Sequence, residues 1–167
     1  MHKLNLIFAG LARDCEQNIV KNVAAIFSLL GQSEVSSLQL LVAENDSKDN
    51  TRDILIRLSK TNANLELSLL PPLDDVFPER IRRIAYCRQV LWEAAYAKSS
   101  CYPIDKTLYV PVDLDSEIFS SVDLGQFTQS CYSLTLDDKI DAIFPASYPY
   151  YYDILALRSS GWCASDC

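Results

Sequence analysis

The amino-acid sequence predicts an α/β protein built on a mainly parallel, doubly wound sheet. Segments with the apolar character of strands alternate with segments of helical periodicity, and the strand-like segments are almost continuously apolar. Continuous apolar strands are typical of parallel sheets, because helices cover both faces of such a sheet. Neither an internal repeat nor a linker interrupts the 167 residues, so we expect a single domain over residues 1–167.

Four strands of this sheet are expected, at residues 4–11, 38–42, 65–70 and 107–112. Pro71-Pro72 ends the third strand. Two further strand candidates follow, at residues 141–147 and 151–158. Right-handed crossovers should connect the parallel strands.

Three helices are expected between the strands, over residues 16–31, 50–59 and 79–98. In the first, which ends at Gly31, helical spacing predicts this inward side: Ile19, Val23, Ile26, Phe27 and Leu30. In the second, the expected inward residues are Ile54, Leu55 and Leu58. In the third and longest, the residues along one side are Ile81, Ile84, Ala85, Arg88, Leu91, Trp92 and Ala95.

The composition argues against several classes of function. A formal net charge of −7 disfavours a general affinity for nucleic acid or an anionic membrane, and no apolar stretch is long enough to span a membrane. The six cysteines include no Cys-x-x-Cys pair and the only histidine is His2, which argues against a zinc site. Cysteines spread through apolar segments are typical of buried, reduced thiols, so we expect a cytoplasmic protein.

Three common motifs of nucleotide binding and catalysis are missing from the sequence. The first expected strand runs into "GLARDCEQN", which is neither a Gly-rich dinucleotide loop nor a phosphate loop with Gly-Lys-Ser/Thr. A Ser/His/Asp set is excluded because the only histidine lies at the start of the chain.

The second expected strand runs directly into the polar stretch "ENDSKDNT", residues 44–51. One interpretation is helix capping, in which Ser47, Asp49 or Asn50 accepts hydrogen bonds from the free N–H groups of the next helix. The other interpretation is a ligand site, because open α/β sheets bind ligands at the carboxyl ends of their strands.

The fourth expected strand ends at Val112 and is followed directly by "DLD", residues 113–115. In an extended chain Asp113 and Asp115 project to the same side, where two carboxylates repel each other unless a cation lies between them. Hard divalent ions prefer such oxygen ligands. The alternative is a pair of solvated acids in a turn. We expect an inner strand here, which would place "DLD" at the same edge as residues 44–46.

Four motifs in series give the sequence a resemblance to the nucleotide-sugar-dependent glycosyltransferases of the GT-A fold. "ENDSKDNT" resembles their early acidic pattern, and "DLD" resembles their metal-binding Asp-x-Asp. "RIRRIAYCRQVLWEA" is similar to the Arg-rich helix before that motif, with Arg88-Gln89 in place of Arg-Asn. "YYYDILALRSSGW" is similar to a segment of the subgroup with fungal capsule-related α-1,3-mannosyltransferases and bacterial relatives. The resemblance covers residues 4–162.

The resemblance implies a metal-dependent transfer of a hexose from a GDP- or UDP-sugar to a glycan or other hydroxyl acceptor. It implies that Asp113 and Asp115 hold Mn²⁺ or Mg²⁺, with Asp113 also reaching ribose and sugar hydroxyls. Arg88 would face the pyrophosphate, and Asp153 would face the sugar or acceptor as the second member of the catalytic set. The nucleotide would contact residues at the ends of the first two strands: Ala12, Arg13, Glu44, Asn45 and Asp46.

The sequence departs from the family pattern at two places, and each departure predicts a structural difference. Asp46 stands where the family usually has Gly, so the backbone there is expected to follow a different turn. The chain stops at Cys167, where such domains continue into acceptor-binding elements. We therefore expect a GT-A-like, Rossmann-like nucleotide-binding domain that is incomplete at its C-terminus.

Each of these interpretations has an alternative. Arg88 could instead pack its stem in the helix and pair with Asp74 or Asp75, and Asp153 could be a turn acid beside packed aromatic residues. A noncatalytic or remnant nucleotide-binding domain is the alternative function. A methyltransferase, with Glu44 on a ribose, is a third possibility, but it lacks the Gly-rich first loop that its cofactor favours.

Overall fold

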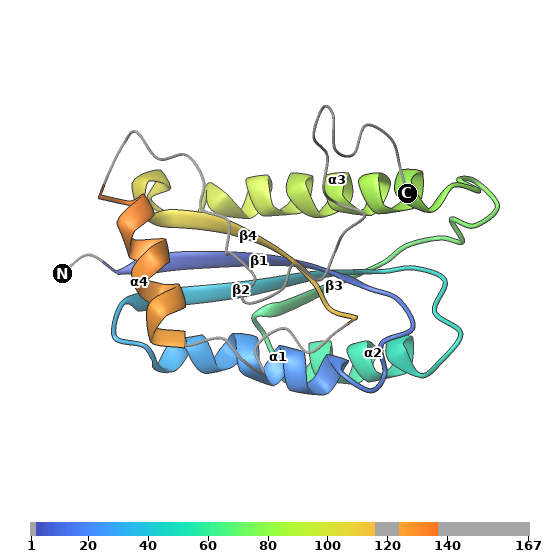
Figure 1. Cartoon of the computed structure of the whole chain (residues 1–167), viewed down its shortest axis with the longest axis horizontal. Helices are drawn as coiled ribbons and strands as arrows, with labels where there is room; N and C mark the ends of the chain where they lie inside the picture. The colour runs from blue at the N-terminus through green and yellow to red at the C-terminus, as the bar shows by residue number, and fades with distance from the viewer. Residues whose placement is uncertain (1–2, 116–123, 137–167) are drawn as a thin grey trace, which may run out of the picture.

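The computed structural model describes residues 3–115 and 124–136, in which a four-stranded parallel sheet is covered by helices on both faces (Figure 1). The main elements in chain order are β1 Leu4–Ala12, α1 Ile19–Ser28, β2 Val35–Glu44, α2 Thr51–Thr61, β3 Leu65–Leu69, α3 Arg80–Ser99, β4 Thr107–Asp113 and α4 Leu124–Leu134. Short 3₁₀ turns, Leu29–Gly31 and Ile104–Lys106, precede β2 and β4. The predicted α/β class and parallel sheet are confirmed, and the arrangement is Rossmann-like.

The strand order is β3-β2-β1-β4, and each neighbouring pair is parallel. Within the described part of the chain, β4 therefore lies at an edge of the sheet, next to β1 alone. The expectation of an inner strand stays a prediction, because it depends on strands outside the described residues. Pro111 suits this edge, because proline has no N–H to donate to a further strand. The strands predicted at residues 141–147 and 151–158, together with Asp153, lie outside the described residues.

Two apolar cores lie on the two faces of the sheet. Alternation along β1 sends Leu6 and Phe8 into the core beneath α1 and α2, and sends Ile7 and Ala9 into the core beneath α3. Both sets of side chains are buried. Burial on both faces explains why the strand sequences are almost continuously apolar.

The inward side of the first helix differs from the prediction at its end. Ile19, Val23 and Ile26 are buried as expected, but Leu29 is buried and Leu30 is exposed. The chain tightens into a 3₁₀ turn at Leu29, which changes the angle between successive side chains. A strict α-helical period therefore predicts burial of Leu30, whereas Leu29 is the buried residue.

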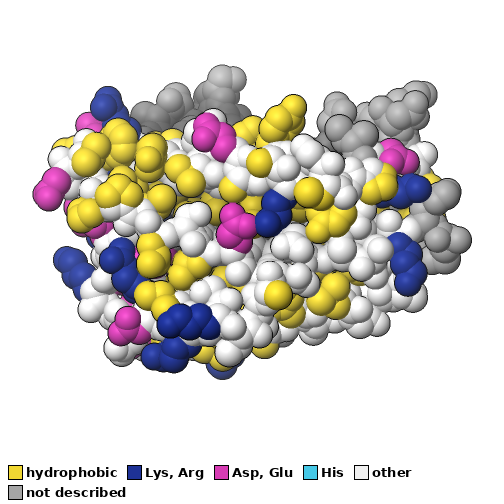
Figure 2. All heavy atoms as spheres, turned by 180° about the vertical axis from the view of Figure 1, so that it is seen from behind, with side chains coloured by type: hydrophobic (Ala, Val, Ile, Leu, Met, Phe, Trp, Pro, Cys, Tyr) yellow, Lys and Arg dark blue, Asp and Glu magenta, His cyan; other side chains and the backbone are white. Residues whose placement is uncertain are grey.

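The inward side of α3 also differs from the prediction. Its buried residues are Cys87, Leu91 and Ala95, whereas Ile81 and Trp92 are exposed. Figure 2 shows apolar side chains at the surface in the upper part of the molecule, where α3 runs in the view of Figure 1. Smaller side chains face the sheet and larger ones lie outside, so apolar character alone does not identify the buried side of this helix.

Helix α4 was not predicted from the sequence. Its Phe127 and Cys131, one helical turn apart, pack into the core beneath α1. The ring centroids of Phe127 and Phe8 are 6.1 Å apart. The described cysteines 15, 87 and 131 are buried free thiols, and Cys101 is an exposed one. No described helix is both long enough and apolar enough to cross a membrane.

Candidate functional site

The carboxyl ends of three strands meet at one edge of the sheet. Ala12 of β1 lies opposite Glu44 of β2, and Leu11 of β1 lies opposite Asp113 of β4. The prediction that Glu44 and Asp113 share an edge is confirmed. The strand order reverses between β1 and β4, because the chain first builds toward β3 and then adds β4 on the other side of β1. Open α/β sheets bind ligands at such a reversal.

Leu114 fixes the end of β4 at this reversal. Its side chain is fully buried, and its N–H donates to the carbonyl of Leu11 at 3.0 Å. Gly10 makes room for this side chain, because a Cβ at position 10 would lie 2.5 Å from Leu114 Cδ1. With Leu114 turned inward, Asp113 and Asp115 on either side of it are exposed.

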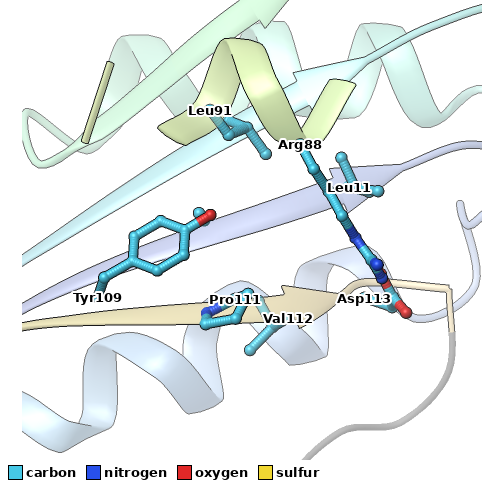
Figure 3. Close-up of a pocket in the computed structure, with 8 residues that line it drawn as sticks. Leu11, Arg88, Leu91, Tyr109, Pro111, Val112 and Asp113 are labelled. Atoms are coloured by element: carbon cyan, nitrogen blue, oxygen red, sulfur yellow. The ribbon is translucent and has the colours of Figure 1, made fainter. Parts of the chain in front are cut away.

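Arg88 reaches across from α3 to Asp113 (Figure 3). Arg88 Nη2 lies 3.5 Å from Asp113 Oδ1, and the two side chains are 57% and 59% exposed. An ion pair this open contributes roughly 0–1 kcal/mol. Both groups therefore remain accessible to a ligand. The alternative partner Asp74 is paired with Arg13 and Arg83 instead.

A pocket of about 340 Å³ lies beside this ion pair, between α3 and the β1–β4 half of the sheet. Figure 3 shows Arg88 and Asp113 at one end of the pocket and the ring of Tyr109 at the other. Its lining residues are Ala9, Leu11, Arg88, Leu91, Tyr109, Pro111, Val112 and Asp113. Partial burial raises the pKa of Tyr109, although the nearby charge of Arg88 acts to lower it. The pocket thus combines an apolar lining with one cation and one anion.

The donor chemistry of Asp113 and Asp115 suits a divalent cation. Their carboxylates are the oxygen ligands that Mn²⁺ and Mg²⁺ prefer, and Mg²⁺ is often held by one or two carboxylates together with substrate phosphates. Within residues 3–115 and 124–136, no three His, Cys, Asp or Glu side chains are placed to hold a metal ion. A metal held by Asp113 and Asp115 would therefore need further oxygen ligands, such as those of a bound diphosphate, and Arg88 would compete with it for Asp113.

Glu44 is fully buried, and both of its carboxylate oxygens are used inside its own loop and helix. Oε1 accepts the N–H of Ser47 at 3.0 Å, and Oε2 accepts the Nε–H of Arg52. The predicted contact of Glu44 with a base or ribose stays a prediction, and it would require these bonds to be exchanged.

Asp46 occupies a backbone conformation that favours glycine, with φ of 52°. Its carboxylate accepts the Leu73 N–H at 2.9 Å and Asn45 Nδ2 at 3.0 Å. Burial acts to raise the pKa of Asp46, but these hydrogen bonds outweigh it and lower the pKa. Asp46 therefore holds a left-handed turn of the kind that glycine favours, and the expectation that this turn differs from that of the family stays a prediction. Asn45 also accepts a hydrogen bond from Cys87 Sγ at 3.6 Å.

The loops after β1 and β2 are joined by reciprocal hydrogen bonds. The Asp14 N–H donates to Ser47 Oγ at 3.1 Å, and Asp14 Oδ1 accepts the Lys48 N–H at 2.7 Å. The Glu16 N–H donates to Asp49 Oδ2 at 3.0 Å, and Glu16 Oε2 accepts the Asn50 N–H at 2.9 Å. We call this set of bonds between residues 14–16 and 47–51 the loop bridge.

Thr51 and Asp49 complete the loop bridge and start α2. Buried Thr51 Oγ1 accepts the Cys15 N–H at 2.8 Å, and the Thr51 N–H donates to Asp49 Oδ1 at 2.9 Å. The prediction that Asp49 accepts a free N–H of the next helix is thus confirmed, although the N-cap residue itself, Asn50, makes no side-chain cap bond. Ser47 and Asn50, the other capping candidates, bond to the loop after β1 instead.

Arg13 makes a two-pronged ion pair with Asp74 rather than facing an open site. Its Nη1 and Nη2 lie 2.9 and 2.8 Å from the two carboxylate oxygens. The hydrogen bond to Arg13 lowers the pKa of Asp74. Neighbouring Ala12 is buried at the end of β1.

Sequence reasoning missed several residues of this edge. Tyr109 lies on β4 and its ring borders the pocket. Strand alternation could have predicted this, because residues 109, 111 and 113 share one side of the strand. No sequence pattern predicts the ion pair of Asp74 and Arg83, because it depends on the path of the loop before α3.

No family model matches the chain, and a search of curated proteins finds no match.

Proposed function

We propose that the protein is a glycosyltransferase that moves a hexose from a GDP- or UDP-sugar to a hydroxyl group of a glycan or a smaller acceptor. The observation that carries the proposal is the open Arg88–Asp113 pair at the reversal of strand order, beside a pocket of about 340 Å³. Asp115 lies exposed two residues further on. The resemblance of "ENDSKDNT", the Arg-rich helix and "DLD" to GT-A enzymes supports the same assignment.

The transfer breaks the bond between C1 of the sugar and the diphosphate oxygen, and forms a bond between C1 and the acceptor oxygen. The acceptor hydroxyl releases its proton, and negative charge develops on the departing diphosphate. Arg88 is proposed to bind that diphosphate, because a guanidinium matches phosphate oxygens in a planar fork. A divalent ion on Asp113 and Asp115, when bound, would supply Lewis-acid neutralisation of the leaving group.

The remaining proposed contacts follow the strand ends. The apolar lining of the pocket offers packing surface for a sugar or base ring next to the charged pair. Asp153, proposed to face the sugar or acceptor, lies outside the described residues. The engagement of Glu44 by Ser47 and Arg52 weighs against a ribose contact of this carboxylate, both in a methyltransferase and in the proposed transferase. The transferase proposal therefore rests on Arg88, Asp113 and Asp115 and not on Glu44.

Calorimetric titration of the full chain with GDP, UDP and ADP, each with and without Mn²⁺, tests the proposal. We expect GDP or UDP to bind more tightly when Mn²⁺ is present. Binding of none of the three, or binding indifferent to Mn²⁺, would contradict a metal-dependent site. Release of GDP or UDP from the matching nucleotide sugar then separates a transferase from a domain that only binds the nucleotide.

A further inference from the structure

Two arginines converge on one carboxylate at the carboxyl edge, apart from the Arg88–Asp113 pair. Arg13 follows the end of β1 and holds both oxygens of Asp74 at 2.9 and 2.8 Å. Arg83, from the first turns of α3, places its Nε 3.1 Å from Asp74 Oδ1. A planar guanidinium fork on two oxygens is also the geometry in which arginine binds phosphate.

The surrounding structure holds Arg83 and the loop without the help of Asp74. Arg83 Nη1 donates to the carbonyls of Phe77 and Pro78 at 2.7 Å each, and its side chain is only 16% exposed. Leu73 is buried, and its N–H is held by Asp46. Asp74 itself is 43% exposed, so it can leave the arginines by turning toward solvent.

The charges around this cluster balance while Asp74 is in place. Asp14 Oδ2 lies 3.6 Å from Arg13 Nε, and Asp46 and Lys48 also act electrostatically on the cluster. Three cations, Arg13, Arg83 and Lys48, then face three carboxylates, those of Asp14, Asp46 and Asp74. An incoming anion can replace the negative charge that Asp74 supplies to the two arginines, whereas a neutral ligand would leave three cations facing only Asp14 and Asp46.

We propose that Arg13 and Arg83 form a binding site for a phosphate-type oxyanion, which Asp74 occupies until the ligand displaces it. Free diphosphate and the phosphates of a nucleotide share this chemistry. The site shares Arg13 with the nucleotide contacts that the resemblance implies, but it uses neither Arg88 nor Asp113. Binding that needs no divalent metal and persists without Arg88 therefore separates this site from the metal-dependent one of the proposed transferase.

Titration with inorganic pyrophosphate, in the absence of divalent metal, tests this proposal. Asp74→Asn should tighten pyrophosphate binding about two- to fivefold, the range expected when an exposed ion pair no longer competes. Asp75→Asn, next door and exposed, removes the same charge and should have a smaller effect. The gain should vanish in Asp74→Asn combined with Arg13→Gln. Equal affinities for the Asp74→Asn and Asp75→Asn variants, or a gain that survives Arg13→Gln, would overturn the proposal.

A second measurement uses the unaltered chain, in case Asp74→Asn does not fold. The Nε–H resonances of Arg13 and Arg83 should shift as pyrophosphate is added, and with GDP if nucleotide phosphates also reach the site. The same shifts should persist in Arg88→Gln. Resonances that do not move at saturation, or that respond only when Arg88 is present, would place the anion at the other site and overturn the proposal.

Discussion

The carboxyl edge of the sheet has two halves, one on each side of β1, and they use similar residues in opposite ways. On the β2 side, buried Glu44 and the acids of the loop bridge accept hydrogen bonds from other groups of the protein. On the β4 side, Arg88, Asp113 and Asp115 remain exposed beside a pocket. The loops after β1 and β2 lie next to each other, and each supplies hydrogen-bond partners for the other. The described end of β4, in contrast, has only β1 as a strand neighbour. An acidic strand end is therefore a candidate ligand site only where no adjacent loop takes up its carboxylates in hydrogen bonds.

We call the β4 side of the edge, with Arg88, Asp113 and Asp115, the open half, and the β2 side, with Glu44 and the loop bridge, the closed half. The largest effect should come from the open half. Asp115→Asn should weaken Mn²⁺-dependent binding of GDP or UDP by on the order of a hundredfold, because an amide is a poorer ligand for a hard cation. Repulsion between two exposed acids is relieved at the same time, so the melting temperature should stay unchanged or rise. Calorimetry and thermal melts measure the two effects.

Two further variants sharpen this result. Asp113→Asn should act in the same direction but more weakly, if that residue is shared between ribose and metal. Asp105→Asn removes the same charge from an exposed acid in the 3₁₀ turn before β4 and should leave binding unchanged. If the Asp115→Asn variant binds Mn²⁺ and nucleotide as tightly as the parent, "DLD" is a solvated turn and the two halves do not differ in function.

The closed half should respond through stability instead. Glu44→Gln removes the charge that holds Arg52 and Ser47, and charge-assisted hydrogen bonds of this kind contribute about 2 kcal/mol to the free energy of unfolding. Glu66→Gln is the matched control, because Glu66 pairs with Lys98 at 2.7 Å but is half exposed, so its loss should cost less than about 1 kcal/mol. Urea unfolding compares the two. A Glu44→Gln variant that stays stable but loses nucleotide binding would show that Glu44 contacts the nucleotide and does not mainly stabilise the fold.

Thr51 tests the loop bridge directly. Thr51→Val keeps the shape of the side chain but leaves the buried N–H of Cys15 without its acceptor, which should cost about 1–2 kcal/mol of unfolding free energy. Thr61→Val, at the exposed end of the same helix, should cost less than about 0.5 kcal/mol. Equal losses in the two variants would show that the loop bridge contributes nothing specific.

Arg88 separates the two interpretations of the open half. Arg88→Lys keeps the charge but loses the planar fork, so binding of GDP or UDP should weaken by about five- to tenfold. Its ion pair with Asp113 is exposed, so the unfolding free energy should change by less than about 0.5 kcal/mol. A clear loss of stability with unchanged binding would assign Arg88 a structural role.

The sequence predicted the parts of this fold that depend on local pattern. The four strands and the shared edge of Glu44 and Asp113 follow from apolar runs and from the rule that parallel strands end at one edge. The buried side of α3 was predicted only in part: Leu91 and Ala95 were included in the predicted side, but this helix carries apolar residues on several sides, and Cys87 is buried whereas Trp92 is exposed.

The site was predictable only in part, for a related reason. Capping by Asp49 is a contact within two residues, and local chemistry predicts it. The partners of Arg13 and Glu16 lie 61 and 34 residues away along the chain, so only the packed loops bring them together. The position of β4 at the described edge likewise depends on strand order, which apolar pattern does not encode.

The smallest expected effect is a pH dependence of the closed half. Burial acts to raise the pKa of Asp49, but hydrogen bonds from Thr51 and Glu16 outweigh it and lower the pKa below its ordinary value of about 3.9. A depressed pKa in the folded state means that Asp49 stabilises the protein above its unfolded-state pKa. That stabilisation is lost as the pH falls through the folded-state pKa. Asp49→Asn should therefore lower the unfolding free energy near neutral pH, and this difference from the parent should shrink below about pH 4. Unfolding at pH 7, 5 and 3 measures it, with Asp53→Asn, in the exposed first turn of α2, as the control. A difference that is constant across the three pH values would mean that the charge of Asp49 does not stabilise the loop bridge.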